Sequence, residues 1–121
     1  MEKMNTSTTI RQDVLLAAAI LAASPKKDAD IEYVSSLLYR LKENDIDLGE
    51  IALRRVPGGF YSEDIETLLG HYLAADYATQ FSPVTLTEQG KRVLSDIIAE
   101  ERRENHKAIE QIEAVLGKLP I

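Results

Sequence analysis

The stretch "SPVTLTEQGKRVLSDIIAEE", residues 82–101, decides the fold of this chain. A short apolar run that contains Val84 and Leu86 follows a proline. Thr87 and two good helix formers then provide the signals of a helix N-terminus, and a glycine and a long amphipathic segment come after them. This order predicts a short strand that turns directly into a long helix.

The segment before this strand extends the pattern. The runs "YATQF", residues 77–81, and "PVTL", residues 83–86, are β-prone and predict a hairpin. Ser62 occupies a capping position with acidic residues in the turn after it, so a helix is expected from there to about Asp76. The apolar residues of that helix recur at helical spacing: Ile65, Leu68, Leu69, Tyr72 and Leu73.

The stretch "DLGEIALRRVPGG" allows two local structures. Asp47 and Glu50 have the spacing of capping residues, which predicts a short helix from Leu48 to Arg55. The alternative makes "ALRRV", residues 52–56, a short strand. In both cases "PGG" marks a turn before the next helix.

The first helix is expected to be a buried one. Thr9 and Gln12 have capping-box spacing, so it should begin near Ile10. It should end at Ser24-Pro25, because the residue before a proline avoids the helical region. The apolar run "VLLAAAILAA" also resembles a signal-peptide core, but it lacks a strongly basic start and an aspartate directly precedes it. The expected inner face is Ile10, Val14, Ala17, Ala18 and Leu21.

A second amphipathic helix follows. Asp28 or Asp30 can cap its N-terminus, and it should end around Asn44. Its predicted apolar face is Ile31, Val34, Leu37, Leu38 and Leu41.

The last helix is predicted to run unbroken from Glu88 to about Gly117, which is roughly 30 residues and about 45 Å. Its middle, "AEERRENHK", residues 99–107, is polar on all sides. Apolar residues with the spacing of a coiled-coil seam follow it: Ile109, Ile112, Leu116 and Leu119. This stripe has to pack on the same chain or on a second copy, and the polar segment before it favours a homodimer. We therefore divide the domain into a core, residues 1–98, and an extension, residues 99–121.

Composition narrows the possible classes of protein. A length of 121 residues fits one domain, and 45% apolar residues provide a modest core. The absence of cysteine excludes disulfides and thiolate metal sites, and fits a reducing compartment such as the cytoplasm. No apolar run approaches the roughly 20 residues that span a bilayer, so no membrane partner is expected. The formal net charge of -6 disfavours nonspecific attraction to nucleic acid.

The sequence contains no recognisable catalytic arrangement. His71 and His106 are too far apart in sequence to form a defined metal-binding motif. Neither Ser62 nor Ser95 has an arranged base near it in sequence. We therefore expect no enzyme, no cofactor and no metal.

Residues 47–94 resemble a winged helix-turn-helix domain. In this resemblance "LGEIALRR" corresponds to the positioning helix and "YSEDIETLLGHYLAADY" to the recognition helix. The hairpin "YATQFSPVTL" corresponds to the wing. "LTEQGKRVL" resembles the strand-to-helix phrase that follows the wing in PadR- and MarR-like regulators. The resemblance implies a mainly α fold, a winged-helix core with a small β-hairpin wing, and a long C-terminal dimerisation helix.

The same resemblance implies a dimeric transcriptional regulator that binds double-stranded DNA. A recognition helix enters the major groove, and flanking cations contact phosphates. Two arginines beside the proposed turn are the best phosphate contacts. The candidate DNA-binding residues are Arg54, Arg55, Thr67, His71, Lys91 and Arg92.

The charge of the proposed recognition helix favours an alternative. Residues 61–77 contain four carboxylates and no lysine or arginine, and the wing "ATQFSP" has no cation. Carboxylates facing phosphates repel them. Arg102 and Arg103 alternate with glutamates, which is typical of a solvated helix face. The alternative function is a winged-helix module that binds another protein and not DNA.

Overall fold

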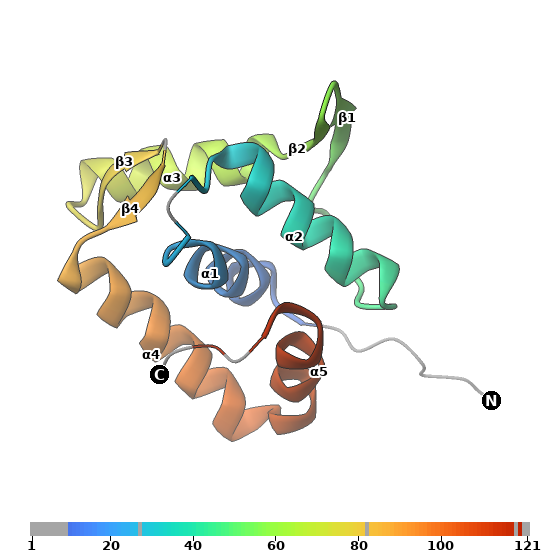
Figure 1. Cartoon of the computed structure of the whole chain (residues 1–121). Helices are drawn as coiled ribbons and strands as arrows, with labels where there is room; N and C mark the ends of the chain where they lie inside the picture. Colours follow the sequence, from blue (N-terminus) through green and yellow to red (C-terminus); the bar gives the residue numbers. More distant parts are fainter. Residues whose placement is uncertain (1–9, 27, 82, 118, 120–121) are drawn as a thin grey trace.

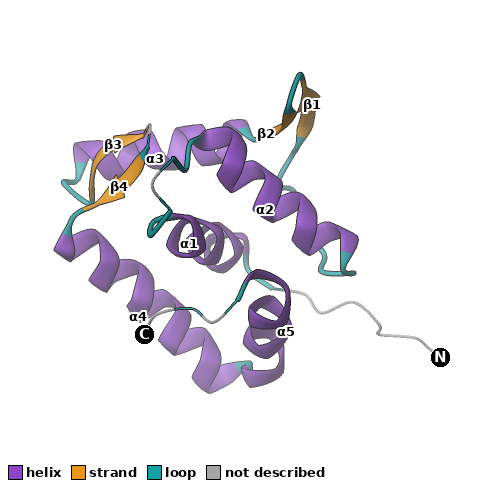
Figure 2. Cartoon of the chain, in the orientation of Figure 1, coloured by secondary structure: helices purple, strands orange, loops and turns teal. Residues whose placement is uncertain are grey.

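The computed structural model describes residues 10–26, 28–81, 83–117 and 119, and it is mainly helical with two small antiparallel hairpins (Figures 1 and 2). The mainly α class predicted from the sequence is therefore confirmed. The elements in chain order are α1 (Gln12–Ala23), α2 (Ile31–Glu43), β1 (Arg54–Val56), β2 (Gly59–Tyr61), α3 (Glu63–Ala74), β3 (Ala78–Phe81), β4 (Val84–Leu86), α4 (Glu88–Glu104) and α5 (His106–Leu116).

Helix α1 is the central element, and α2, α4 and α5 pack around it (Figure 1). Its sequence is apolar on every side, and a helix of that kind has to be buried all round. The side chains from Val14 to Leu21 are all buried. The buried helix was predicted correctly, as was its end before Ser24-Pro25. It begins at Gln12 without a side-chain cap, later than the predicted start near Ile10, and Thr9 lies outside the described residues.

Helix α2 follows its predicted pattern. Of the two candidate caps the structure uses Asp30, whose carboxylate accepts a hydrogen bond of 2.8 Å from the Tyr33 backbone N–H. The helix ends at Glu43, with Asn44 as its C-cap. Four of the five predicted inner residues are fully or almost fully buried, and Ile31 is partly buried against the core: Ile31, Val34, Leu37, Leu38 and Leu41.

The short helix predicted from Leu48 to Arg55 is wrong, and the strand interpretation is right. The Asp47 carboxylate accepts from the Gly49 backbone N–H at 2.8 Å, and Gly49 has a φ of 62°, which a helix cannot contain. Arg54–Val56 instead pairs in antiparallel register with Gly59–Tyr61. The "PGG" turn therefore closes a β-hairpin and does not join two helices.

Helix α3 and the second hairpin form as predicted. The Ser62 hydroxyl accepts from the Ile65 backbone N–H at 3.3 Å, and Ile65 and Leu69 are fully buried. Strands β3 and β4 are antiparallel, with a register shift near Ala78. The backbone N–H of Val84 donates to the carbonyl of Ala29 at 2.6 Å, so this hairpin is bonded to the loop before α2.

The phrase "LTEQG" joins β4 to α4 through a very close contact. Thr87 makes four hydrogen bonds. Its backbone N–H donates to the carbonyl of Tyr77, and its own carbonyl accepts from the backbone N–H of Lys91. Its hydroxyl donates to the carbonyl of Asp76 and accepts from the backbone N–H of Gly90. A Cβ at Gly90 would overlap the Tyr77 carbonyl, so only glycine fits there. The strand-to-helix transition is thus set by these side chains and by close backbone packing.

The unbroken terminal helix is wrong. The helix stops at Glu104, bends at Asn105 and returns as α5 beside α1 and α2 (Figure 1). The proposed seam residues lie against their own chain: Ile109, Ile112 and Leu119 are buried and Leu116 is partly buried. The sequence left open whether this stripe packs on its own chain or on a second copy, and in the structure it packs on its own chain. The seam therefore no longer supports a homodimer.

Candidate interaction surface formed by the arm and helix α3

The β1–β2 hairpin, residues 54–61, projects from the body of the molecule, and we call it the arm (Figure 1). Its register places Arg54 opposite Tyr61 and Arg55 opposite Phe60. The guanidinium carbon of Arg54 lies 4.9 Å from the ring centroid of Tyr61, and that of Arg55 lies 5.1 Å from the ring centroid of Phe60. Cross-strand cation–π pairs of this kind hold both arginines against the arm.

The base of the arm is fixed to α2. The rings of Tyr39 and Phe60 stack with their centroids 3.9 Å apart and an angle of 16° between their planes. The backbone N–H of Ser62 donates to the buried hydroxyl of Ser35 at 2.8 Å, and that hydroxyl donates to the carbonyl of Ile31 at 2.7 Å. The direction of the arm is therefore set by helix α2.

Acidic side chains of α3 turn toward the arm. The Arg54 Nε lies 3.5 Å from a carboxylate oxygen of Glu63, and both side chains are largely exposed. Burial, then a hydrogen bond to Glu66 and the charge of that carboxylate, raise the pKa of Tyr61 above its ordinary value. Asp64 accepts from the backbone N–H of Ala52 at 3.0 Å. The arm and the first turns of α3 thus form one connected surface.

The rest of the exposed face of α3 mixes small, polar and apolar side chains with carboxylates. The helix contains no lysine or arginine. A Cβ at Gly70 would have nothing within 4 Å, so that no contact inside the chain requires glycine there. Leu73, 38% exposed, is the large apolar side chain that the described part of the chain leaves most open. Besides these two, the exposed residues of the helix are Glu63, Glu66, Thr67, His71 and Ala74.

The structure brings together four of the six predicted DNA-binding residues. Arg54 and Arg55 lie on the arm, and Thr67 and His71 lie on the exposed side of α3. The other two, Lys91 and Arg92, are exposed in the first turns of α4, and the Lys91 ammonium lies 3.8 Å from Glu88. Figure 1 places the start of α4 at the opposite end of α3 from the arm.

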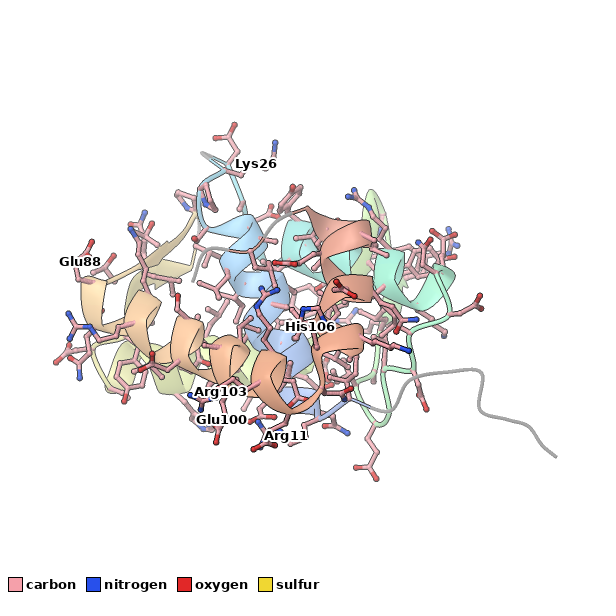
Figure 3. All side chains as sticks on the ribbon, turned by 90° about the horizontal axis from the view of Figure 1, so that it is seen from below. Arg11, Lys26, Glu88, Glu100, Arg103 and His106 are labelled. Carbon is pink, nitrogen blue, oxygen red and sulfur yellow. The ribbon has the colours of Figure 1, made fainter. Side chains whose placement is uncertain are left out.

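The hairpin in the wing position carries no positive charge. Two of its polar side chains, Gln80 and Thr85, hydrogen-bond each other at 3.3 Å. The exposed charged side chains of α4 point away from the body, as Figure 3 shows for Glu100 and Arg103. The positive charges of α4 therefore do not extend the surface formed by the arm and α3.

Sequence reasoning missed the arm itself. The signal was present, because "RRV" and "FY" are strand-compatible residues on either side of a Pro-Gly-Gly turn. The capping spacing of Asp47 and Glu50 outweighed it in the prediction. Arg54 and Arg55 do flank a turn, as predicted, but it is the turn of a hairpin.

Within the described ranges, no group of three or more histidine, aspartate or glutamate side chains could hold a metal ion. His106 lies 3.7 Å from Glu110, its neighbour one turn on in α5. Across the same ranges, no helix combines the length and the apolar character required to cross a bilayer.

Comparison with known proteins found no match: no family model fits the chain, and no curated protein or solved structure matches at a significant level. The functional argument therefore depends on the surface itself.

Proposed function

We propose that this chain is a protein-interaction module, and that the exposed face of α3 binds a basic segment of another protein. The observation that carries the proposal is the charge of that face. Glu63 and Glu66 are exposed, the helix contains no lysine or arginine, and the chain has a net charge of -6. Complementary charge directs encounter and selects partners.

Gly70 supports close contact at the centre of this face. Glycine in an exposed helix interior costs about 1 kcal/mol relative to alanine. A side chain at this position would contact nothing else in the chain, so packing within the molecule does not explain why glycine is present. A partner whose backbone approaches the helix closely would supply such a reason.

The same features weigh against DNA on this face. Phosphates would meet the carboxylates of α3, and Arg54 is already near Glu63. A typical operator contact uses several Lys and Arg side chains on phosphates, and these are absent from both α3 and the β3–β4 hairpin.

The proposal is tested by anisotropy titrations of labelled oligo-lysine and labelled duplex DNA at two salt concentrations. Oligo-lysine should bind at low salt. The double change Glu63→Gln and Glu66→Gln should weaken that binding several-fold. The matched change Glu100→Gln and Glu104→Gln removes the same charge from exposed positions of α4 and should have a smaller effect. Equal loss in both variants, or sub-micromolar binding of DNA, would overturn the proposal.

The second candidate is a dimeric transcriptional regulator that binds double-stranded DNA, and Arg55 is the observation that favours it. Of the residues that the structure describes, no carboxylate makes an ion pair with Arg55, and the side chain is exposed on the projecting arm. If the arm binds DNA, Arg54→Ala with Arg55→Ala should weaken binding and flatten its salt dependence. Unchanged DNA binding in that variant would exclude the arm as the contact.

A further inference from the structure

The bend between α4 and α5 is not produced by local sequence. Residues 99–107 contain neither glycine nor proline, and their composition suits a continuous helix. At the bend, Asn105 adopts a φ of -144° and a ψ of 62°. It occupies the N-cap position of α5, but its side chain makes no capping hydrogen bond. The side-chain amide of Asn105 donates instead to the carboxylate of Glu101 at 3.3 Å.

Tertiary contacts hold the bend. Arg102 donates two hydrogen bonds to the Glu113 carboxylate, of 3.1 and 2.7 Å, and the same carboxylate accepts from the backbone N–H of Leu119 at 3.1 Å. The apolar side of α5 fills the space beside α1 and α2, where Ala108, Ile109 and Ile112 are fully buried. The bend is therefore stabilised by the docking of α5 and not by the conformational preference of Asn105.

One group in this connection lacks a partner. The Nε of Arg102 is buried and has no hydrogen-bond partner within the part of the chain that the structure describes. An unsatisfied buried donor weakens the docking of α5, and the same cost returns wherever the Arg102–Glu113 pair forms again. Conflict between local helix preference and tertiary packing is the condition under which a segment has two arrangements of similar free energy.

We propose that α4 and α5 straighten through Asn105 into one helix and exchange α5 between two copies of this chain, which gives a domain-swapped dimer. The straight helix from Glu88 to Leu116 would be about 43 Å long. The apolar side of α5 would then leave its own α1 and α2. The surface that fits it is the same surface on a second copy, so the burial of Ile109 and Ile112 and the Arg102–Glu113 pair are all re-formed between chains. This inference is independent of the function proposed for α3.

The first test changes the hinge. Asn105→Ala favours the straight helix. Because each copy contributes one hinge, this change should lower the Kd of the dimer roughly tenfold. Asn105→Gly disfavours the straight helix and should raise that Kd. Asp96→Ala increases helix preference at an exposed position of α4 away from the hinge and is the matched control. Light scattering after chromatography, on samples annealed at several concentrations, measures the dimer. An unchanged population in Asn105→Ala would overturn the proposal.

The second test distinguishes a swap from any other dimer. An Arg102→Glu copy and a Glu113→Arg copy each place like charges at the bend. In a swapped mixed dimer, each copy meets the complementary residue of the other, so mixing should give a heterodimer that neither variant forms alone. Glu88→Lys and Lys91→Glu, which reverse an exposed pair within one helix, should show no such complementation. A mixture no more dimeric than the separate variants would overturn the proposal, even if Asn105→Ala forms a dimer.

Discussion

The two hairpins of this chain have the same topology and opposite environments. The β3–β4 hairpin buries Ala78, Val84 and Leu86 and bonds to the loop before α2. The arm has no buried residue, and its strands are held by two cation–π pairs and by the stack on Tyr39. The difference indicates that β3–β4 belongs to the core, while the arm is available to a partner.

The largest expected effect is at the junction after β4. Gly90→Ala places a methyl group against the Tyr77 carbonyl, and neither backbone can move without breaking the bonds of Thr87. We expect a loss of about 3 kcal/mol or more in the free energy of unfolding, measured by urea denaturation. Gly70→Ala, at an open helical position, should instead stabilise the chain by about 0.5–1 kcal/mol. Similar effects at the two glycines would contradict this account of the junction.

Thr87→Ala should cost about 1–2 kcal/mol, because it removes the cap of α4 and the bond to Asp76. Thr85→Ala changes an exposed residue of the same hairpin and should cost less, within about 0.5 kcal/mol. Thermal denaturation followed by circular dichroism would measure both. An equal loss in the two variants would mean that the hairpin, and not the cap, is responsible.

Alkaline pH should lower the free energy of unfolding through Tyr72 of α3. Burial, followed by the charge of Asp13 and the neighbouring Tyr77, raises the pKa of Tyr72 from 10.0 to about 12. The folded chain therefore holds this proton more tightly than the unfolded chain does. The resulting stability is complete below pH 10 and is lost as the pH rises toward 12.

Urea midpoints of the native chain and of Tyr72→Phe over this pH range would measure the effect. The native chain should lose stability more steeply than the variant. Parallel curves would show that Tyr72 ionises equally easily in the folded and unfolded states.

Only a small loss of global stability is expected from a change in the arm. Phe60→Ala removes the stack on Tyr39 and the ring beneath Arg55, but the side chain is only partly buried. We expect a loss of about 1 kcal/mol in global stability, with faster amide exchange confined to residues 54–61. A loss of several kcal/mol would place the arm in the cooperative core and remove the contrast between the hairpins.

Much of the fold could be predicted because its signals are local. The capping residues of α2, α3 and α4 stand one residue before their helices, and each accepts the expected backbone hydrogen bond: Asp30, Ser62 and Thr87. The candidate surface was predicted only in part. Four of its residues were named from the sequence, but the arm that presents two of them was expected to be a helix.

The sequence by itself determined the elements whose ends are capped and whose apolar residues repeat at one period, since a cap and one buried face are properties of neighbouring residues. At Arg54–Val56 the sequence left a helix and a strand open, and the structure decided for the strand. Tertiary structure alone decided the bend at Asn105. At both places helix preferences differ by only a few tenths of a kcal/mol per residue. Pairing with β2 at the first place, and burial of Ile109 and Ile112 at the second, outweigh those preferences.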